Sequence, residues 1–152
     1  MKSTRIKVRE VRPQDIKEIF KHMSVQSILG IKSLYGRVVQ DDIINMLIAS
    51  ERSICVLYGA RQVALVFFVR TNQNSCNMFL LFTSRMLKCY NDVQEQLLSE
   101  MSCIDCSELN TLVYEGSNTE QRYMEDLGFE QTESLFVSLE GKKHLMYRKQ
   151  IK

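Results

Sequence analysis

The sequence has 152 residues, of which 45% are hydrophobic, 25% charged and 9% aromatic, as expected for one globular domain with a sizeable core. Its 20 basic and 18 acidic residues leave a formal charge of +2, and the absence of any block of like charges argues against a nucleic-acid-binding protein. No apolar stretch approaches the ~18 residues of a membrane span and no signal peptide is visible, so we expect no membrane association and a cytoplasmic location, with the nucleus as the alternative.

The five cysteines are an odd number and are scattered along the chain, a pattern that suits a reducing compartment. Cys103 and Cys106 form a C-x-x-C pair, the closest pair in the sequence. A zinc site would need a second pair or histidines nearby, and the two histidines are His22 and His144. We therefore expect the cysteines to be structural and no metal to be bound.

The first third of the chain predicts one strand followed by helices. Residues 4–11 alternate apolar and basic side chains, which indicates a half-buried strand. Pro13 and Asp15 then suit the start of a helix. Apolar residues at helical spacing indicate helical segments over 14–23, 24–36 and 41–49. In the second of them we expect Ile28 to face inward.

A group of strong strand signals follows. Three apolar runs, over 53–58, 62–70 and 76–83, predict strands with both faces of the sheet covered. An amphipathic helix is expected over 91–102, with Asn91 and Gln94 as a capping box.

The last third predicts a strand, a short helix and two closing strands. The strand covers 109–115, and Asn118 with Gln121 would cap a helix that runs to Leu127 and ends at Gly128. The closing strands are expected over 129–139 and 143–150. The strand–helix–strand unit in the middle of this order normally gives parallel strands joined by a right-handed crossover.

Three segments together resemble the GCN5-related N-acetyltransferase family. NTEQRYMEDLGFE at 118–130 is similar to the family's late short helix and the turn after it, IKVREVRPQDIKEI to its first strand and helix, and HLMYRKQI to its last strand. The resemblance covers nearly the whole chain. It implies a single domain over residues 1–152 with an α/β (α+β) fold, a mixed and mostly antiparallel sheet of six to seven strands flanked by about four helices.

The family binds the pyrophosphate of acetyl-CoA with a glycine-bearing loop before its central helix, where backbone N–H groups hold the anion. Here the corresponding segment, TSRMLKCYNDVQ over 83–94, contains no glycine, and Asp92 and Gln94 stand where the glycines would be. This departure puts ordinary acetyl-CoA binding in doubt. The resemblance still assigns the cofactor contacts to Arg85, Lys88, Asn91, Val93 and Asn118, with Arg85 and Lys88 placed to reach phosphates from the flank.

Members of the family often use a tyrosine of the late helix as a general acid. In register with Leu127-Gly128 that position holds Met124, which cannot donate a proton, and Tyr123 lies one residue earlier, about 100° away on a helix. We take Tyr123 as the candidate acid. Glu115, at the end of its strand, is the candidate base for an attacking amine.

Two functions follow from these observations. The first is transfer of an acyl group from acetyl-CoA to a primary amine, on a small molecule or a peptide, by direct attack. The alternative is a catalytically inactive protein of the same fold that binds a protein or peptide partner. A homodimer is a further alternative, in which the eight methionines and the Phe67-Phe68 pair supply contact surface.

Overall fold

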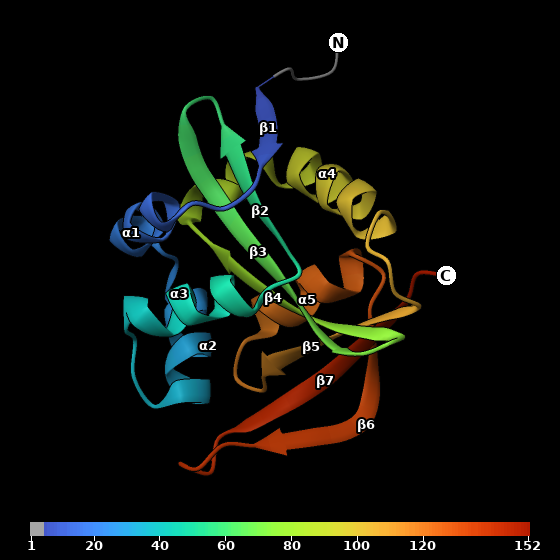
Figure 1. The fold of residues 1–152 in the computed structure, drawn as a ribbon. Helices are drawn as coiled ribbons and strands as arrows, with labels where there is room; N and C mark the ends of the chain where they lie inside the picture. The colour runs from blue at the N-terminus through green and yellow to red at the C-terminus, as the bar shows by residue number, and fades with distance from the viewer. Residues whose placement is uncertain (1–4) are drawn as a thin grey trace.

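A seven-stranded mixed sheet runs through residues 5–152, the part of the chain that the computed structural model describes (Figure 1). Its strands are β1 (Ile6–Arg9), β2 (Arg52–Tyr58), β3 (Arg61–Asn72), β4 (Ser75–Phe82), β5 (Glu108–Tyr114), β6 (Glu130–Val137) and β7 (Lys143–Gln150). The helices are α1 (Pro13–His22), α2 (Val25–Tyr35), α3 (Gln40–Ala49), α4 (Tyr90–Ser102), α5 (Asn118–Asp126) and the 3-10 helix η1 (Ser84–Cys89). The spatial order is β1-β2-β3-β4-β5-β7-β6, in which β4 and β5 are parallel and the other neighbours antiparallel.

The predicted fold class is confirmed, with five α-helices over the described residues where about four were expected. Residue 4 of the predicted first strand lies outside those residues. The expectation for Ile28 is wrong: it is exposed, and α2 instead buries Ser27, Ile31 and Ser33. The small serine side chains let this helix lie close to the sheet.

The strands bury both of their faces, as their continuous apolar runs predicted. Along β3, Val66 and Phe68 join the core beneath α4 and α5, whereas Leu65 and Phe67 join the core beneath α1, α2 and α3 (Figure 1). Alternate side chains of a strand point to opposite faces, so one strand contributes to both cores. Because Phe67 and Phe68 are fully buried, they are packing residues and supply no contact surface for a homodimer.

Strands β4 and β5 pair over three positions and then diverge. The paired residues are Ser75 with Glu108, Cys76 with Leu109 and Asn77 with Asn110. The end of β4 bonds to the start of α2 instead, because the Ser24 N–H donates to the Phe82 carbonyl (2.9 Å) and the Phe82 N–H donates to Ser27 Oγ (3.0 Å). Figure 1 shows the two strands running apart. The divergence opens a gap in the middle of the sheet.

Two predicted helix caps are wrong by one or more positions. Ser117 caps α5 by accepting from the Glu120 N–H, and Gln121 bonds to the Glu115 carbonyl. At α4 the residue before the helix, Cys89, makes no side-chain cap. The end of α5 agrees with the prediction, since Gly128 follows it with φ of 90°, a conformation that favours glycine.

Candidate functional site

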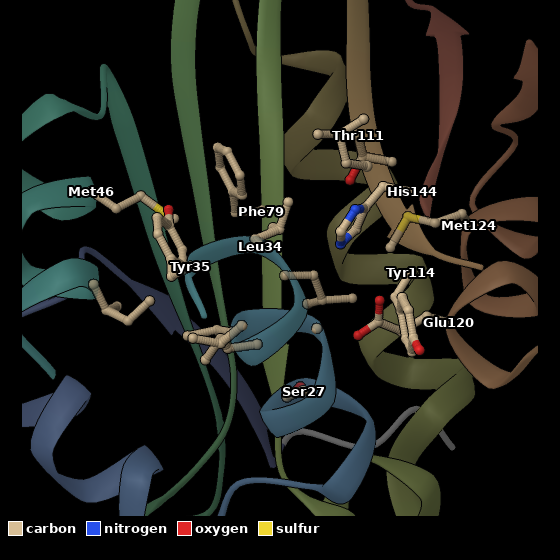
Figure 2. Close-up of a pocket in the computed structure, with 16 residues that line it drawn as sticks. Ser27, Leu34, Tyr35, Met46, Phe79, Thr111, Tyr114, Glu120, Met124 and His144 are labelled. Carbon is tan, nitrogen blue, oxygen red and sulfur yellow. The ribbon is translucent and has the colours of Figure 1, made fainter. Parts of the chain in front are cut away.

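The gap between β4 and β5 contains a pocket, which we call the β4–β5 pocket (Figure 2). Its volume of about 50 Å³ exceeds what a water molecule requires. It is lined from α2 by Ser27, Gly30, Ile31, Leu34 and Tyr35, from α3 by Ile43 and Met46, from β4 by Phe79, Leu80 and Leu81, from β5 by Thr111, Leu112 and Tyr114, from α5 by Glu120 and Met124, and from β7 by His144. Most of these side chains are apolar, and a few polar groups converge among them, as is usual for ligand pockets.

Glu120 is the one carboxylate in the lining of this pocket. It lies in the first turn of α5 and is 8% exposed. Among residues 5–152 no hydrogen bond or ion pair to its carboxylate is found, and Gly30 of α2 lies close by, since a Cβ added there would be 3.6 Å from Glu120 Oε1. Burial raises the pKa of Glu120 to about 8, because a charge is poorly solvated there. At neutral pH the Glu120 carboxyl group is therefore mostly protonated.

His144 lies on the other side of the pocket and is fully buried. Its Nε2 is 2.7 Å from Ser33 Oγ, a bond that joins β7 to α2. Burial lowers the pKa of His144 below its ordinary value of 6.5, so the ring is neutral at pH 7. With Glu120 protonated as well, the pocket carries no net charge at neutral pH.

The backbone of β4 also faces this gap. Successive residues of a strand direct their N–H and C=O groups to opposite sides. Phe82 turns its N–H and C=O toward α2, and Met78 accepts a bond from Thr111 Oγ1 of β5 (2.8 Å). Leu80, between them, therefore points its N–H and C=O into the gap. The pocket is therefore lined by the Leu80 backbone edge and the Glu120 carboxyl group, and the buried His144 Nδ1 also has no hydrogen-bond partner among the described residues.

Tyr123 and Met124 occupy different sides of α5. Met124 lines the β4–β5 pocket, whereas Tyr123 packs on the rings of Phe82 and Tyr90, with centroids 5.2 and 4.8 Å away. Tyr123 is 5% exposed and its hydroxyl has no partner among the described residues. Burial, and then the nearby Glu120, raise its pKa. The structure thus separates the candidate acid from this pocket.

Glu115 and Asn118 lie beside the same end of β5 but outside the pocket. Both are exposed. Glu115 uses its backbone, with its N–H on the Lys143 carbonyl and its own carbonyl accepting from Gln121. Asn118 is the first residue of α5. The candidate base and the last candidate cofactor contact therefore share a neighbourhood without facing the β4–β5 pocket.

The other predicted cofactor contacts are spread over η1 and α4. Arg85 lines a separate shallow hollow with Glu18, His22, Ala60, Arg61 and Gln62. Lys88 and Asn91 are exposed, and Val93 is buried in the core beneath α4. Arg85 and Lys88 are three residues apart in η1, whereas Val93 is buried in the core and does not share their surface.

The segment before α4 does not fit the pyrophosphate of acetyl-CoA. It forms η1, which runs directly into α4 and buries Met86 and Cys89, so no open glycine-lined loop precedes the helix. Asp92 adds a negative charge to the first turn of α4. A diphosphate there would face side chains where backbone N–H groups are needed, and a carboxylate of its own sign.

The space between α4 and α5 is bridged as well. Tyr90 Oη donates to Asp126 Oδ2 (2.7 Å), and Gln94 Nε2 donates to the Asp126 carbonyl (2.7 Å). The Tyr90 ring lies against that of Tyr123. Gln94, at one of the expected glycine positions, is therefore part of a link between the two helices.

Sequence reasoning missed Glu120 as a site residue. The available signal was its spacing: Glu120 precedes Met124 by four residues in NTEQRYMED, so both lie on one face of the helix. Since the family register assigns Met124 to the site, the same face carries Glu120 one turn earlier. Its burial had no sequence signal, because the residue that covers it, Gly30, is distant in the chain.

No helix within residues 5–152 is long and apolar enough to cross a membrane. In the same residues no group of three or more His, Cys, Asp or Glu side chains is arranged to hold a metal ion. All five cysteines are free thiols, and Cys103 is the exposed one.

Comparison with solved structures agrees with the fold described above, although no family model and no curated protein matches the sequence. Ard1 from Thermoplasma volcanium matches with a TM-score of 0.76 at 12% identity, over 98% of this chain and 99% of that chain. A GNAT-family acetyltransferase from Bacillus anthracis matches with a TM-score of 0.72 at 16% identity, over 99% and 97%. YncA from Salmonella typhimurium, solved with its cofactor acetyl-CoA, matches with a TM-score of 0.67 at 12% identity, over 98% and 95%. At such identities the likeness shows the fold, and it is the predicted one.

Proposed function

We propose that this chain, which has the GCN5-related N-acetyltransferase fold, is a ligand-binding protein that no longer uses acetyl-CoA and that takes its ligand in the β4–β5 pocket. The observation that carries the proposal is the closed segment before α4. There η1 replaces a glycine-lined loop, and Tyr90 and Gln94 bridge α4 to Asp126 of α5. Fold alone does not entail an activity, so the proposal rests on the state of this segment and not on the fold.

Two physical costs support this proposal. A diphosphate near Asp92 meets a like charge, a repulsion of about 1–4 kcal/mol at close range, depending on solvent exposure. Opening a path between α4 and α5 breaks the two hydrogen bonds to Asp126, each worth about 1 kcal/mol. The nearby cations Arg85 and Lys88 offset part of the repulsion. Lys88 is exposed, where an ion pair contributes about 1 kcal/mol or less.

The test is calorimetric titration of the purified protein with acetyl-CoA, with a thermal-shift measurement beside it. YncA, which has been solved with acetyl-CoA, is the positive control for the cofactor preparation. We expect no heat of binding and no thermal shift at millimolar acetyl-CoA. Micromolar binding would show that the glycine-free segment still holds a diphosphate, and the proposal would be wrong.

The second candidate function is N-acyl transfer to a primary amine. It is favoured by one observation, the carboxyl group of Glu120 with a pKa of about 8 in a pocket that the Leu80 backbone faces, because a group that titrates near neutral pH suits acid–base catalysis. Under this candidate Tyr123 and Glu115 remain the proposed acid and base. The proposed cofactor contacts are Arg85, Lys88, Asn91, Val93 and Asn118.

An amine-acceptor screen that measures release of the CoA thiol tests this second candidate. Turnover above the uncatalysed rate would support it, and Tyr123→Phe should then lower the rate while Arg85→Ala with Lys88→Ala should weaken the affinity for acetyl-CoA. Wild-type rate and affinity in those variants would mean that Tyr123, Arg85 and Lys88 have no part in catalysis or cofactor binding. No turnover with any amine would mean that the second candidate is wrong, and ligand binding would remain as the proposed function.

A further inference from the structure

We infer that two copies of this chain pair through the free edge of β6 and form a two-fold symmetric dimer. β6 is the last strand in the spatial order of the described sheet, so one of its edges has no neighbouring strand (Figure 1). An open strand edge presents N–H and C=O groups that can pair with another chain. The inference does not depend on the proposed function, because no residue of β6 lines the β4–β5 pocket.

Three consecutive apolar residues are exposed near the end of β6. Leu135, Phe136 and Val137 are each 42–55% exposed, in a segment where a solvated edge strand would normally carry polar side chains. From Ser134 to Ser138 the sequence contains no charged residue. A second copy can therefore approach this segment without burying a charge, and it covers apolar surface when it does so.

The opposite edge of the sheet is protected against such pairing. β1 forms that edge, is four residues long and carries Lys7 and Arg9. Short edge strands and charged side chains are common means of preventing strand pairing between molecules. On β6 the register with β7 is irregular between Gln131 and Leu135, so the regular, open part of the edge begins at Leu135.

The backbone of this segment is oriented for pairing with another strand. The Ser138 N–H donates to the Lys142 carbonyl (2.9 Å), and Phe136 is paired with β7 two positions earlier. Since hydrogen-bonded positions alternate along an antiparallel pair, Phe136 also turns its N–H and C=O toward β7. Leu135 and Val137 therefore direct their N–H and C=O groups away from β7, toward the free edge.

These outward groups fix the register of a two-fold antiparallel pair. Leu135 of one copy lies opposite Val137 of the other, the two residues exchange both N–H···O bonds, and the symmetry repeats this exchange. Phe136 then lies at the two-fold axis, opposite its own copy. The Phe136 ring is 5.8 Å from the His144 ring, so the two Phe136 side chains meet on that face of the sheet and the other apolar side chains meet on the opposite face.

Sedimentation equilibrium of the purified protein at a series of concentrations tests for association. We expect monomers at low micromolar concentration and a mass approaching two chains at high micromolar concentration, because one strand pair is a small interface and small interfaces associate weakly. Val137→Lys places a charge in the interface, and Val137→Pro removes a bonding N–H while keeping an apolar side chain. Each should weaken the dimer at least about tenfold, since both copies lose the interaction. Ile48→Lys, at a 77%-exposed apolar residue of α3, is the matched control and should leave association unchanged.

A cysteine cross-link tests the register. Opposed Cα atoms of a non-hydrogen-bonded antiparallel pair lie about 4.5 Å apart, within the range of about 4.4–6.8 Å that a disulfide spans. Phe136→Cys should therefore link two copies when diamide oxidises the two thiols and takes up their hydrogens, in a Cys103→Ser background because Cys103 is the exposed native thiol. Ser134→Cys in the same background is the control. In this register its two copies are offset by four residues, about 13 Å along the strand, and should not link.

A monomer at every concentration, a dimer that Val137→Lys leaves unchanged, equal loss of association in Ile48→Lys, or cross-linking of Ser134→Cys as efficient as that of Phe136→Cys would each overturn the inference. Thermal unfolding checks that the variants are folded. Val137→Lys changes an exposed side chain, so its unfolding midpoint should stay close to that of the wild type, and it decides the question of association even where Val137→Pro unfolds.

Discussion

Asp15 and Glu120 are both buried carboxylates in the first turn of a helix, and their surroundings differ in every other respect. Asp15 of α1 is 1% exposed and accepts from two nitrogens of Arg9 (2.6 and 2.8 Å), from Gln62 Nε2 (2.9 Å) and from the Arg12 N–H (2.8 Å). Burial alone would raise its pKa, but these bonds outweigh burial and lower it to about 2. Glu120 has burial without the bonds, and its pKa rises to about 8.

The difference shows that burial does not decide the role of a carboxylate; its partners do. Asp15 has used its acceptor capacity on the protein, and in doing so it joins β1, α1 and β3. The Glu120 carboxyl group has no protein partner among the described residues, so it can still bond to a ligand in the pocket. A fully partnered buried ion favours one fixed structure, whereas an unpartnered one lowers stability and marks a candidate site.

Removing the Asp15 carboxylate should cost the most. Asp15→Ala removes four hydrogen bonds to one buried carboxylate and should lower the free energy of unfolding by about 3–5 kcal/mol, since each is worth about 1 kcal/mol. Urea denaturation measures it. Asp42→Ala, which breaks an ion pair with the 65%-exposed Arg37, is the control and should cost about 1 kcal/mol or less. Similar losses in the two variants would contradict the structural role of Asp15.

The pH dependence of stability should separate the two carboxylates. The folded-state pKa of Glu120 is raised from 4.5 to about 8. Its contribution to the free energy of unfolding is therefore fully present below pH 4.5 and is lost as the pH rises to 8. Between pH 5 and 9 the wild type should lose about 3–4 kcal/mol relative to Glu120→Gln. The folded-state pKa of Asp15 is lowered from 3.8 to about 2, so its contribution is lost as the pH falls through that window.

Denaturation at a series of pH values measures both effects on one protein. The Glu120 effect is the difference between the wild-type and Glu120→Gln curves, which removes the contribution of the other groups. Parallel curves from pH 5 to 9 would mean that Glu120 ionises normally in the folded protein. The proposed difference in ionisation between Glu120 and Asp15 would then be wrong.

Gln62→Ala removes one of the bonds to Asp15 and should cost about 1.5–2 kcal/mol, because a hydrogen bond to a buried charged group is lost. The same measurement on Gln14→Ala is the control. Gln14 bonds to Glu18 at 3.5 Å on the exposed surface, and its loss should change stability by less than about 0.5 kcal/mol. A cost for Gln62→Ala as small as the control's would mean that Arg9 and the backbone suffice to hold Asp15.

Gly30→Ala should produce the smallest change and of opposite sign. Gly30 lies within α2, and an added Cβ would make an ordinary contact 3.6 Å from Glu120 Oε1, so the better helix former should stabilise the protein by about 0.5–1 kcal/mol. It should also narrow the β4–β5 pocket, which Gly30 lines. Gly36→Ala is the control and should destabilise, because Gly36 has φ of 73° and its Cβ would meet Glu140 at 2.8 Å. A loss of stability in Gly30→Ala would show that the neighbouring side chains cannot shift to accommodate the added Cβ.

Local pattern predicted most of the fold. Apolar spacing identified the helices and strands, and the late segment NTEQRYMEDLGFE carried the family resemblance that the solved structures bear out as a fold. The missing glycines before α4 were also readable, since they depend on residue identity alone. The helix caps were harder to predict from the sequence. Ser117 and Asn118 are both good N-cap residues, and the choice between them depends on the backbone geometry at the helix start.

Sequence alone therefore determined the order of elements, the absence of a glycine loop and the presence of Met124 where a tyrosine was expected. Tertiary structure alone decided that β4 and β5 part after three pairs, that Gly30 covers Glu120, and that Ser33 meets His144 across 111 residues of chain. The physical reason is the range of the forces that matter. Helix and strand patterns arise between residues a few positions apart, whereas burial, and the pKa that follows from it, depends on whichever distant segment packs against a side chain.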